Sequence, residues 1–100
     1  MTKKEKNISL TLTNLWNTID ERKNSDPAIS YTALLFKKGA KRVAQKMGEE
    51  AVETVIASLG KNKKEIAEES ADLIYHLMVL WNICGISPED VYKVLDNRKT

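Results

Sequence analysis

The sequence LIYHLMVLWNIC, residues 73–84, is apolar on nearly every side of a helix. Only His76 and Asn82 interrupt it. A helix that is apolar all round is normally buried inside a protein. The same helix extends back to about Lys64, and Gly85 ends it. We therefore expect a buried helix over residues 64–84 and an all-α fold around it.

Apolar residues at steps of three and four predict further helices on both sides of this segment. Glycine and proline, which break helices, number only four and two. Gly60 and Asn62 are expected to end the longest of these helices, and Ser87 is expected to cap the last one. The expected helices span Ile8–Arg22, Ser30–Phe36, Ala40–Leu59 and Ser87–Arg98. The fold class is thus an all-α bundle of four to five helices.

Length and composition limit the classes of protein that the chain can represent. One hundred residues suit a single domain, 1–100, with an ordered core over about 8–98. No apolar run approaches the roughly 20 residues of a membrane-spanning helix, and the polar start Met1–Lys6 does not resemble a secretion signal. The net charge of +2 is too small and too mixed to favour nucleic acid. Cys84 is the single cysteine, so the chain cannot form an internal disulfide framework. We expect Cys84 to be an inert core thiol and the protein to be cytoplasmic.

Two carboxylate pairs with equal spacing carry the functional signal. Glu50 and Glu53 form the first pair, and Glu69 and Asp72 form the second. An i, i+3 spacing places both members on one helix face, where like charges repel by roughly 0.2–0.5 kcal/mol. Such repulsion on two successive helices indicates a compensating cation. A divalent metal with oxygen ligands is the natural candidate.

The short connection Gly60–Lys63 predicts that the two helices lie antiparallel as neighbours. Both pairs would then face each other and form a site for magnesium or manganese. Lys46 lies one turn before Glu50, so an alternative is a solvated surface with ordinary ion pairs. His76 follows Asp72 on the same strip and either orients Asp72 or is a buried histidine satisfied by a carboxylate or carbonyl.

Several strings of residues resemble the phosphoribosyl-ATP pyrophosphohydrolase family, the second enzyme of histidine biosynthesis. The wider pattern of E-x-x-E and E-x-x-D is similar to that of the all-α nucleoside triphosphate pyrophosphohydrolases, which include the MazG type. The resemblance covers about Leu12–Arg98. Its motifs are Ser30–Thr32, Lys37–Gly39, Gln45–Glu53 and Glu69–His76.

This resemblance implies a small helical protomer that is completed as an obligate homodimer. It also implies magnesium-dependent cleavage of phosphoribosyl-ATP to phosphoribosyl-AMP and pyrophosphate, with manganese as a possible substitute. The implied metal ligands are Glu50, Glu53, Glu69 and Asp72. Glu49 is adjacent and is either a further ligand or the base that accepts a proton from water, a role also open to Glu53.

Substrate contacts are predicted beside these acids. Lys38 and Lys46 are candidates to contact phosphate as point charges, and Arg42 offers a planar fork, although a solvated face is an equal alternative for Arg42. Ser30, Tyr31 and Thr32 are candidates to contact the phosphates or ribose. Alternatively, Ser30 only caps the short helix that follows it.

Two other functions are compatible with the same sequence. The first is a house-cleaning pyrophosphohydrolase that acts on canonical or damaged nucleoside triphosphates with the same carboxylates. The second is a non-enzymatic helical interaction module whose acidic pairs are only solvated faces. Assays of pyrophosphate release distinguish the first alternative, and thermal stabilisation by magnesium distinguishes the second.

Overall fold

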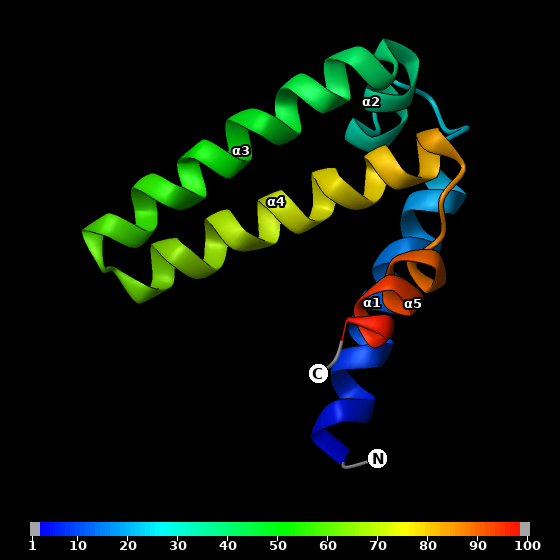
Figure 1. Cartoon of the computed structure of the whole chain (residues 1–100). Helices are drawn as coiled ribbons and strands as arrows, with labels where there is room; N and C mark the ends of the chain where they lie inside the picture. The colour runs from blue at the N-terminus through cyan, green and yellow to red at the C-terminus, as the bar shows by residue number, and fades with distance from the viewer. Residues whose placement is uncertain (1–2, 99–100) are drawn as a thin grey trace.

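The computed structural model describes the backbone of residues 3–98 and the side chains of residues 10–98. Within this range it contains five helices and no strand, which confirms the all-α prediction (Figure 1). The helices are α1 (Lys3–Arg22), α2 (Tyr31–Lys38), α3 (Ala40–Gly60), α4 (Lys63–Cys84) and α5 (Pro88–Asn97). Two predictions concern residues whose side chains are not described. They are the absence of a secretion signal at Met1–Lys6 and the outer limits of the domain.

The helix limits agree with the predicted limits to within about two residues except at the start of α1. We expected this helix to begin at Ile8, where the apolar spacing starts, but the backbone is already helical from Lys3. Lysine and glutamate are good helix formers, and they dominate residues 3–6. The helix therefore extends beyond the part that apolar spacing alone could identify.

Helices α3 and α4 form a long antiparallel hairpin, as the short connection predicted (Figure 1). Lys61 adopts a left-handed conformation with φ of 62°, and the side chain of Asn62 accepts a hydrogen bond of 3.2 Å from the backbone N–H of Glu65. Asn62 thus begins α4 rather than ending α3, which corrects its expected role. An asparagine side chain at this position satisfies one of the free N–H groups of the following helix.

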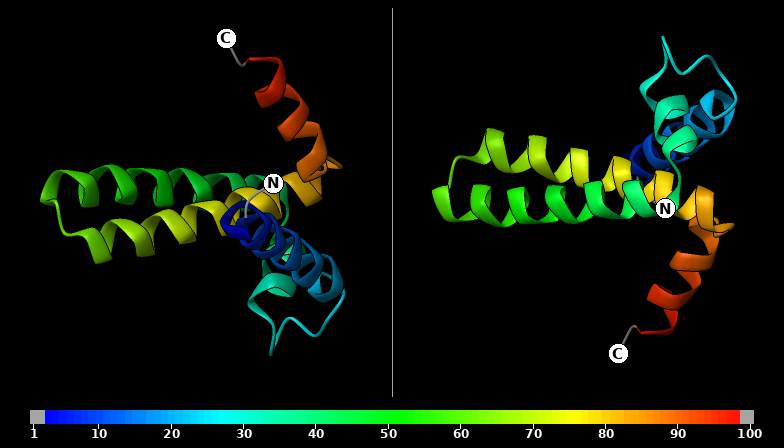
Figure 2. Two further views of the ribbon diagram at one scale, coloured as in Figure 1. Left: turned by 90° about the horizontal axis from the view of Figure 1, so that it is seen from below. Right: turned by 90° about the horizontal axis from the view of Figure 1, so that it is seen from above.

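The remaining helices gather at the open end of this hairpin. Helix α2 lies against both α3 and α4, and Gly39, with φ of 89°, makes the sharp turn between α2 and α3. Helices α1 and α5 leave this end on opposite sides of the hairpin (Figure 2). Ser87 and Asp90 form the expected capping box at the start of α5, since each side chain accepts a hydrogen bond from the other residue's backbone.

The hydrophobic core lies where α1 and α2 cover the hairpin. Its buried members come from four helices, and the two tryptophans are half-buried against it. The core residues are Ile19, Leu35, Val43, Met78 and Val79, with Trp16 and Trp81 packed beside them. This packing fixes one end of α3 and α4 firmly and leaves the other end as a two-helix arm.

The expectation that α4 is buried from Leu73 onward holds only for its inner side. Ile74 is 42% exposed, because two helices alone cover only one face of each other. Cys84 is also exposed rather than buried, since it lies at the end of α4 where the chain turns toward α5. Among the described residues, no helix is both long and apolar enough to cross a bilayer.

Candidate functional site

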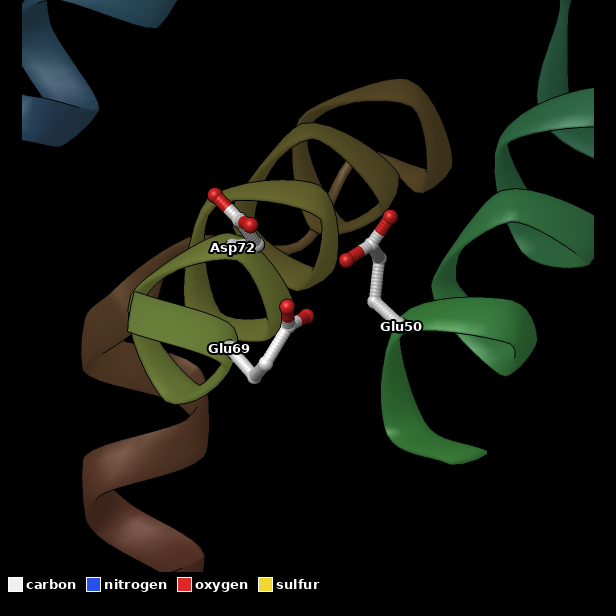
Figure 3. A group of neighbouring side chains, drawn as sticks. All are labelled: Glu50, Glu69 and Asp72. Atoms are coloured by element: carbon white, nitrogen blue, oxygen red, sulfur yellow. The ribbon is translucent and has the colours of Figure 1, made fainter. Parts of the chain in front are cut away.

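Three carboxylates converge between α3 and α4. Glu50 extends from α3 toward α4, where Glu69 and Asp72 lie one turn apart (Figure 3). One oxygen from each residue lies within 4.8 Å of an oxygen of each of the others. Glu50 is buried, Glu69 is half-buried and Asp72 is exposed, so the cluster is closed on one side and open to solvent on the other. We call these three residues the acidic triad.

Glu69 has the least favourable surroundings of the three carboxylates in the acidic triad. Its Oε2 atom is buried and has no hydrogen-bond partner among the described residues. Burial raises the pKa of the Glu69 carboxyl above its usual range, and the neighbouring Glu53, Asp72 and Glu50 raise it further. An unpaired carboxylate in such surroundings is expensive. A multivalent cation placed among the three carboxylates would remove this cost.

Glu53 lies at the edge of the triad. It is exposed, and it is not part of the group whose oxygens are mutually within 4.8 Å. Its charge and a side-chain contact nevertheless raise the pKa of Glu69, so the two carboxyls are neighbours. The structure therefore brings three of the four expected metal ligands together and places the fourth beside one of them.

Among the described residues, basic side chains of α3 pair with the α3 acids at and beside the triad. Lys46 Nζ lies 3.4 Å from Glu50 Oε1, and this contact is the main reason that the pKa of Lys46 is raised. Glu49 lies 4.0 Å from both Lys46 and Arg42 and accepts a hydrogen bond of 3.5 Å from Gln45. Glu49 thus lies beside two basic side chains and outside the triad, and its predicted role as a ligand or base stays a prediction.

A buried histidine joins α2 to α4 beside the site. His76 is 5% exposed, and its Nδ1 lies 2.7 Å from the backbone oxygen of Asp72. A carbonyl oxygen only accepts, so Nδ1 carries the proton and Nε2 accepts the hydrogen bond of 3.0 Å from the Tyr31 hydroxyl. His76 is therefore a buried histidine that is satisfied by a backbone carbonyl, which is one of its two expected roles. It contacts the main chain of Asp72 and not the Asp72 carboxylate.

Of the predicted substrate residues at α2, Tyr31 contacts this histidine directly. The Tyr31 ring stacks on Tyr75 with an interplanar angle of 24°, and the Thr32 hydroxyl is hydrogen-bonded to the Tyr75 hydroxyl. Burial is the main reason that the pKa of Tyr75 is raised. Ser30 accepts a hydrogen bond of 3.1 Å from the Ala33 N–H and so caps α2, which is the structural role considered for it. Lys38 is exposed at the other end of α2.

Sequence reasoning overlooked Thr54. Its Oγ1 lies 2.8 Å from the backbone oxygen of Glu50 and 3.2 Å from that of Glu69. The spacing of four residues from Glu50 is a signal that could have identified the first contact, because threonine in a helix commonly bonds to the carbonyl four residues earlier. The second contact depends on how α3 and α4 are aligned, which spacing does not specify.

Comparisons with known proteins agree closely with one another. A family model described as phosphoribosyl-ATP pyrophosphohydrolase matches residues 12–99. A phosphoribosyl-ATP pyrophosphatase of Paramagnetospirillum magneticum is 51% identical over 90 residues, which make up 90% of this chain and 83% of that protein. The corresponding protein of Azospirillum brasilense is 48% identical over 95 residues, 95% of this chain and 86% of the relative. That of Gluconobacter oxydans is 46% identical over 90 residues, 90% of this chain and 68% of the relative.

Proposed function

The chain belongs to the phosphoribosyl-ATP pyrophosphohydrolase family, and from this membership we propose that it hydrolyses phosphoribosyl-ATP to phosphoribosyl-AMP and pyrophosphate, the second step of histidine biosynthesis. The observation that carries the proposal is the convergence of Glu50, Glu69 and Asp72 from two helices. Carboxylates alone repel a polyphosphate. They serve its hydrolysis when they hold a cation that the phosphates also bind.

The donor set fits magnesium, with manganese as a substitute. Both ions prefer oxygen ligands, and magnesium is commonly held by one or two carboxylates together with substrate phosphates. The buried Oε2 of Glu69 supports a cation here, since it has no hydrogen-bond partner among the described residues. Glu50, Glu69 and Asp72 would hold the ion, with Glu53 as a fourth ligand. The ion, when bound, would neutralise charge on the phosphates and acidify water.

The basic residues beside Glu50 are suited to binding the phosphates. Lys46 spans the gap between Glu50 and Glu49, so a phosphate oxygen could replace either carboxylate as its partner. Arg42 would grip two phosphate oxygens with its planar fork, and Lys38 would add charge at the end of α2. These residues would orient the triphosphate with its scissile bond toward the acidic triad.

When Glu53 is not itself engaged by the ion, it is better placed than Glu49 to accept the proton of the attacking water. Glu53 neighbours Glu69 within the site, whereas Glu49 is held by Arg42 and Lys46. Tyr31, which is exposed on the first turn of α2 and close enough to Lys46 to raise its pKa, would contact the ribose or phosphates. Thr32 is buried and hydrogen-bonded to the Tyr75 hydroxyl, so it would support this turn.

The exposed apolar side chains on the hairpin support a homodimer. On α3 these side chains are between 59% and 77% exposed, and Ile74 lies on α4. They are Val52, Val55, Ile56 and Leu59. Such residues normally face a partner, and a second copy would bury them by extending the hairpin into a larger bundle. Light scattering at micromolar concentration should give a dimer mass, and Ile56→Asp should shift it toward a monomer.

The substrate is tested by measuring pyrophosphate release from phosphoribosyl-ATP beside dUTP and the common nucleoside triphosphates. We expect clear preference for phosphoribosyl-ATP and restored growth without histidine in a strain that lacks this step. Preference for dUTP or another triphosphate would support the house-cleaning alternative. Absence of pyrophosphate release, together with no thermal stabilisation by magnesium, would support the interaction module.

A further inference from the structure

Thr54 lies on α3 at the level of the acidic triad and connects the two helices that carry it. Its Oγ1 is 2.8 Å from the backbone oxygen of Glu50 on the same helix and 3.2 Å from that of Glu69 on α4. The two acceptors therefore belong to two of the three residues whose carboxylates converge. We propose that Thr54 is a positioning residue that fixes the separation of Glu50 and Glu69, an inference that rests on the proposed metal site.

The chemistry of the two contacts makes the hydroxyl a bridge. A threonine hydroxyl carries one proton, and both partners are carbonyl oxygens that can only accept. The proton is consequently shared between Glu50 O and Glu69 O, with the shorter contact to Glu50. Because each carbonyl belongs to the main chain from which the carboxylate extends, this bridge holds the starting points of both side chains.

A bridge at this position opposes the repulsion between the carboxylates. An oxygen of Glu50 on α3 and an oxygen of Glu69 on α4 lie within 4.8 Å of each other, so the charges on the two helices push against each other. The hydrophobic core lies farther along the hairpin, at Val43, Met78 and Val79. Thr54 therefore supplies a cross-helix contact beyond that core, where the triad most needs one.

Removal of the hydroxyl should disturb the site more than the fold. Within a helix the carbonyls of Glu50 and Glu69 also accept from backbone N–H groups, so Thr54→Val leaves neither carbonyl without a hydrogen-bond donor. Groups that orient metal ligands typically contribute 10–100-fold to metal affinity. We expect Thr54→Val to weaken Mn²⁺ binding by a factor in that range and Thr54→Ser, which keeps the hydroxyl, to bind within about threefold of the original chain.

The experiment titrates Mn²⁺ into the full-length protein without substrate and follows free Mn²⁺ by electron paramagnetic resonance. Ser58→Ala is the matched control, because the exposed Ser58 hydroxyl donates a hydrogen bond of 2.7 Å to the Val55 carbonyl on its own helix. Circular dichroism of each metal-free variant reports the fold. In a second measurement, excess Mg²⁺ should restore the turnover of Thr54→Val, since only metal affinity has changed.

The outcomes separate this inference from the proposed function. Unchanged Mn²⁺ affinity in Thr54→Val would overturn the role of Thr54 and leave the metal site intact. Equal losses in Thr54→Ser and Thr54→Val would overturn it as well, because the hydroxyl would not then be responsible. If Thr54→Val fails to fold, the result for Thr54→Ser alone decides in the same way. Failure of the original chain to bind Mn²⁺ would contradict the metal site, and Thr54 with it.

Discussion

The acids on α3 and the acids on α4 have the same spacing but different surroundings. On α3, Glu50 lies 3.4 Å from Lys46, and Glu49 lies 4.0 Å from Arg42. On α4, no lysine or arginine among the described residues lies within 4.0 Å of the Glu69 or Asp72 carboxylate. Two of the α3 acids thus have a basic side chain within 4.0 Å, whereas the two α4 acids have none among the described residues.

This difference shows that spacing identifies a possible ligand, while the neighbouring charges determine what the ligand needs. Glu49 has partners and would gain little from a metal ion. Glu69 has a buried oxygen without a partner and a raised pKa, so a cation would stabilise it strongly. The α4 acids are therefore the part of the proposed site that depends most on metal.

The largest effect expected from this comparison concerns catalysis. Glu69→Gln and Asp72→Asn remove charge with little change in shape, and each should lower pyrophosphate release by at least about 100-fold, the upper range for residues that only orient ligands. Glu49→Gln should lower it less than about tenfold, because its carboxylate lies among cations outside the triad. Steady-state assays at saturating magnesium provide the measurement.

Circular dichroism and light scattering of the same variants serve as the control for folding and assembly. Near-normal turnover of Asp72→Asn would contradict its assignment as a metal ligand. A loss in Glu49→Gln as large as that in Glu69→Gln would show that the difference between the two helices has no catalytic meaning.

A smaller effect is expected from replacing Lys46, the lysine that pairs with the α3 acids. Lys46→Met should raise KM for phosphoribosyl-ATP by roughly tenfold, because a hydrogen bond between charged groups contributes about 1.5–3 kcal/mol and tenfold corresponds to about 1.4 kcal/mol. Lys64→Met is the matched control, since Lys64 pairs with Glu68 in an exposed position away from the triad. Equal KM values for both variants would exclude Lys46 from phosphate binding.

Much of the fold was predictable because helices depend on local patterns. Apolar spacing, the glycine breaks and the Ser87 cap identified all five helices, and the short Gly60–Lys63 connection predicted the antiparallel hairpin. The degree of burial was less predictable, because an apolar side chain has the same pattern whether it faces its own chain or a partner. Ile74 and Cys84 were therefore expected to be buried, yet both are exposed in the single chain.

The site was predictable to the level of helix faces. Spacing placed Glu50, Glu69 and Asp72 on facing sides of two helices, and the structure brings them together. Spacing could not predict which carboxylate of α3 lies opposite which carboxylate of α4. The axial alignment of the two helices decides whether Glu53 or Glu50 faces Asp72. The same alignment gives Thr54 its contact with Glu69, and the docking of α2 gives His76 its contact with Tyr31.

The smallest expected effect is on the pH dependence of stability in the metal-free protein. The pKa of Glu69 is raised above its ordinary value of 4.5 in the folded state, mainly by burial. The folded state thus holds this proton more tightly than the unfolded state does. The resulting stabilisation is complete below pH 4.5 and is lost as the pH rises through the raised folded pKa. Glu69→Gln has no such proton to lose.

Thermal unfolding in the presence of a chelator should consequently favour Glu69→Gln increasingly as the pH rises from about 4 to 7. Saturating magnesium at pH 7 should reverse the order, because the ion stabilises the original chain by mass action, about 2.7 kcal/mol at 100 times its dissociation constant, and binds the variant weakly. Glu49→Gln should show neither trend, since the partners of Glu49 are cations. A difference in unfolding temperature between Glu69→Gln and the original chain that is independent of pH in the chelator would contradict the idea that the ionised Glu69 carboxylate destabilises the metal-free fold.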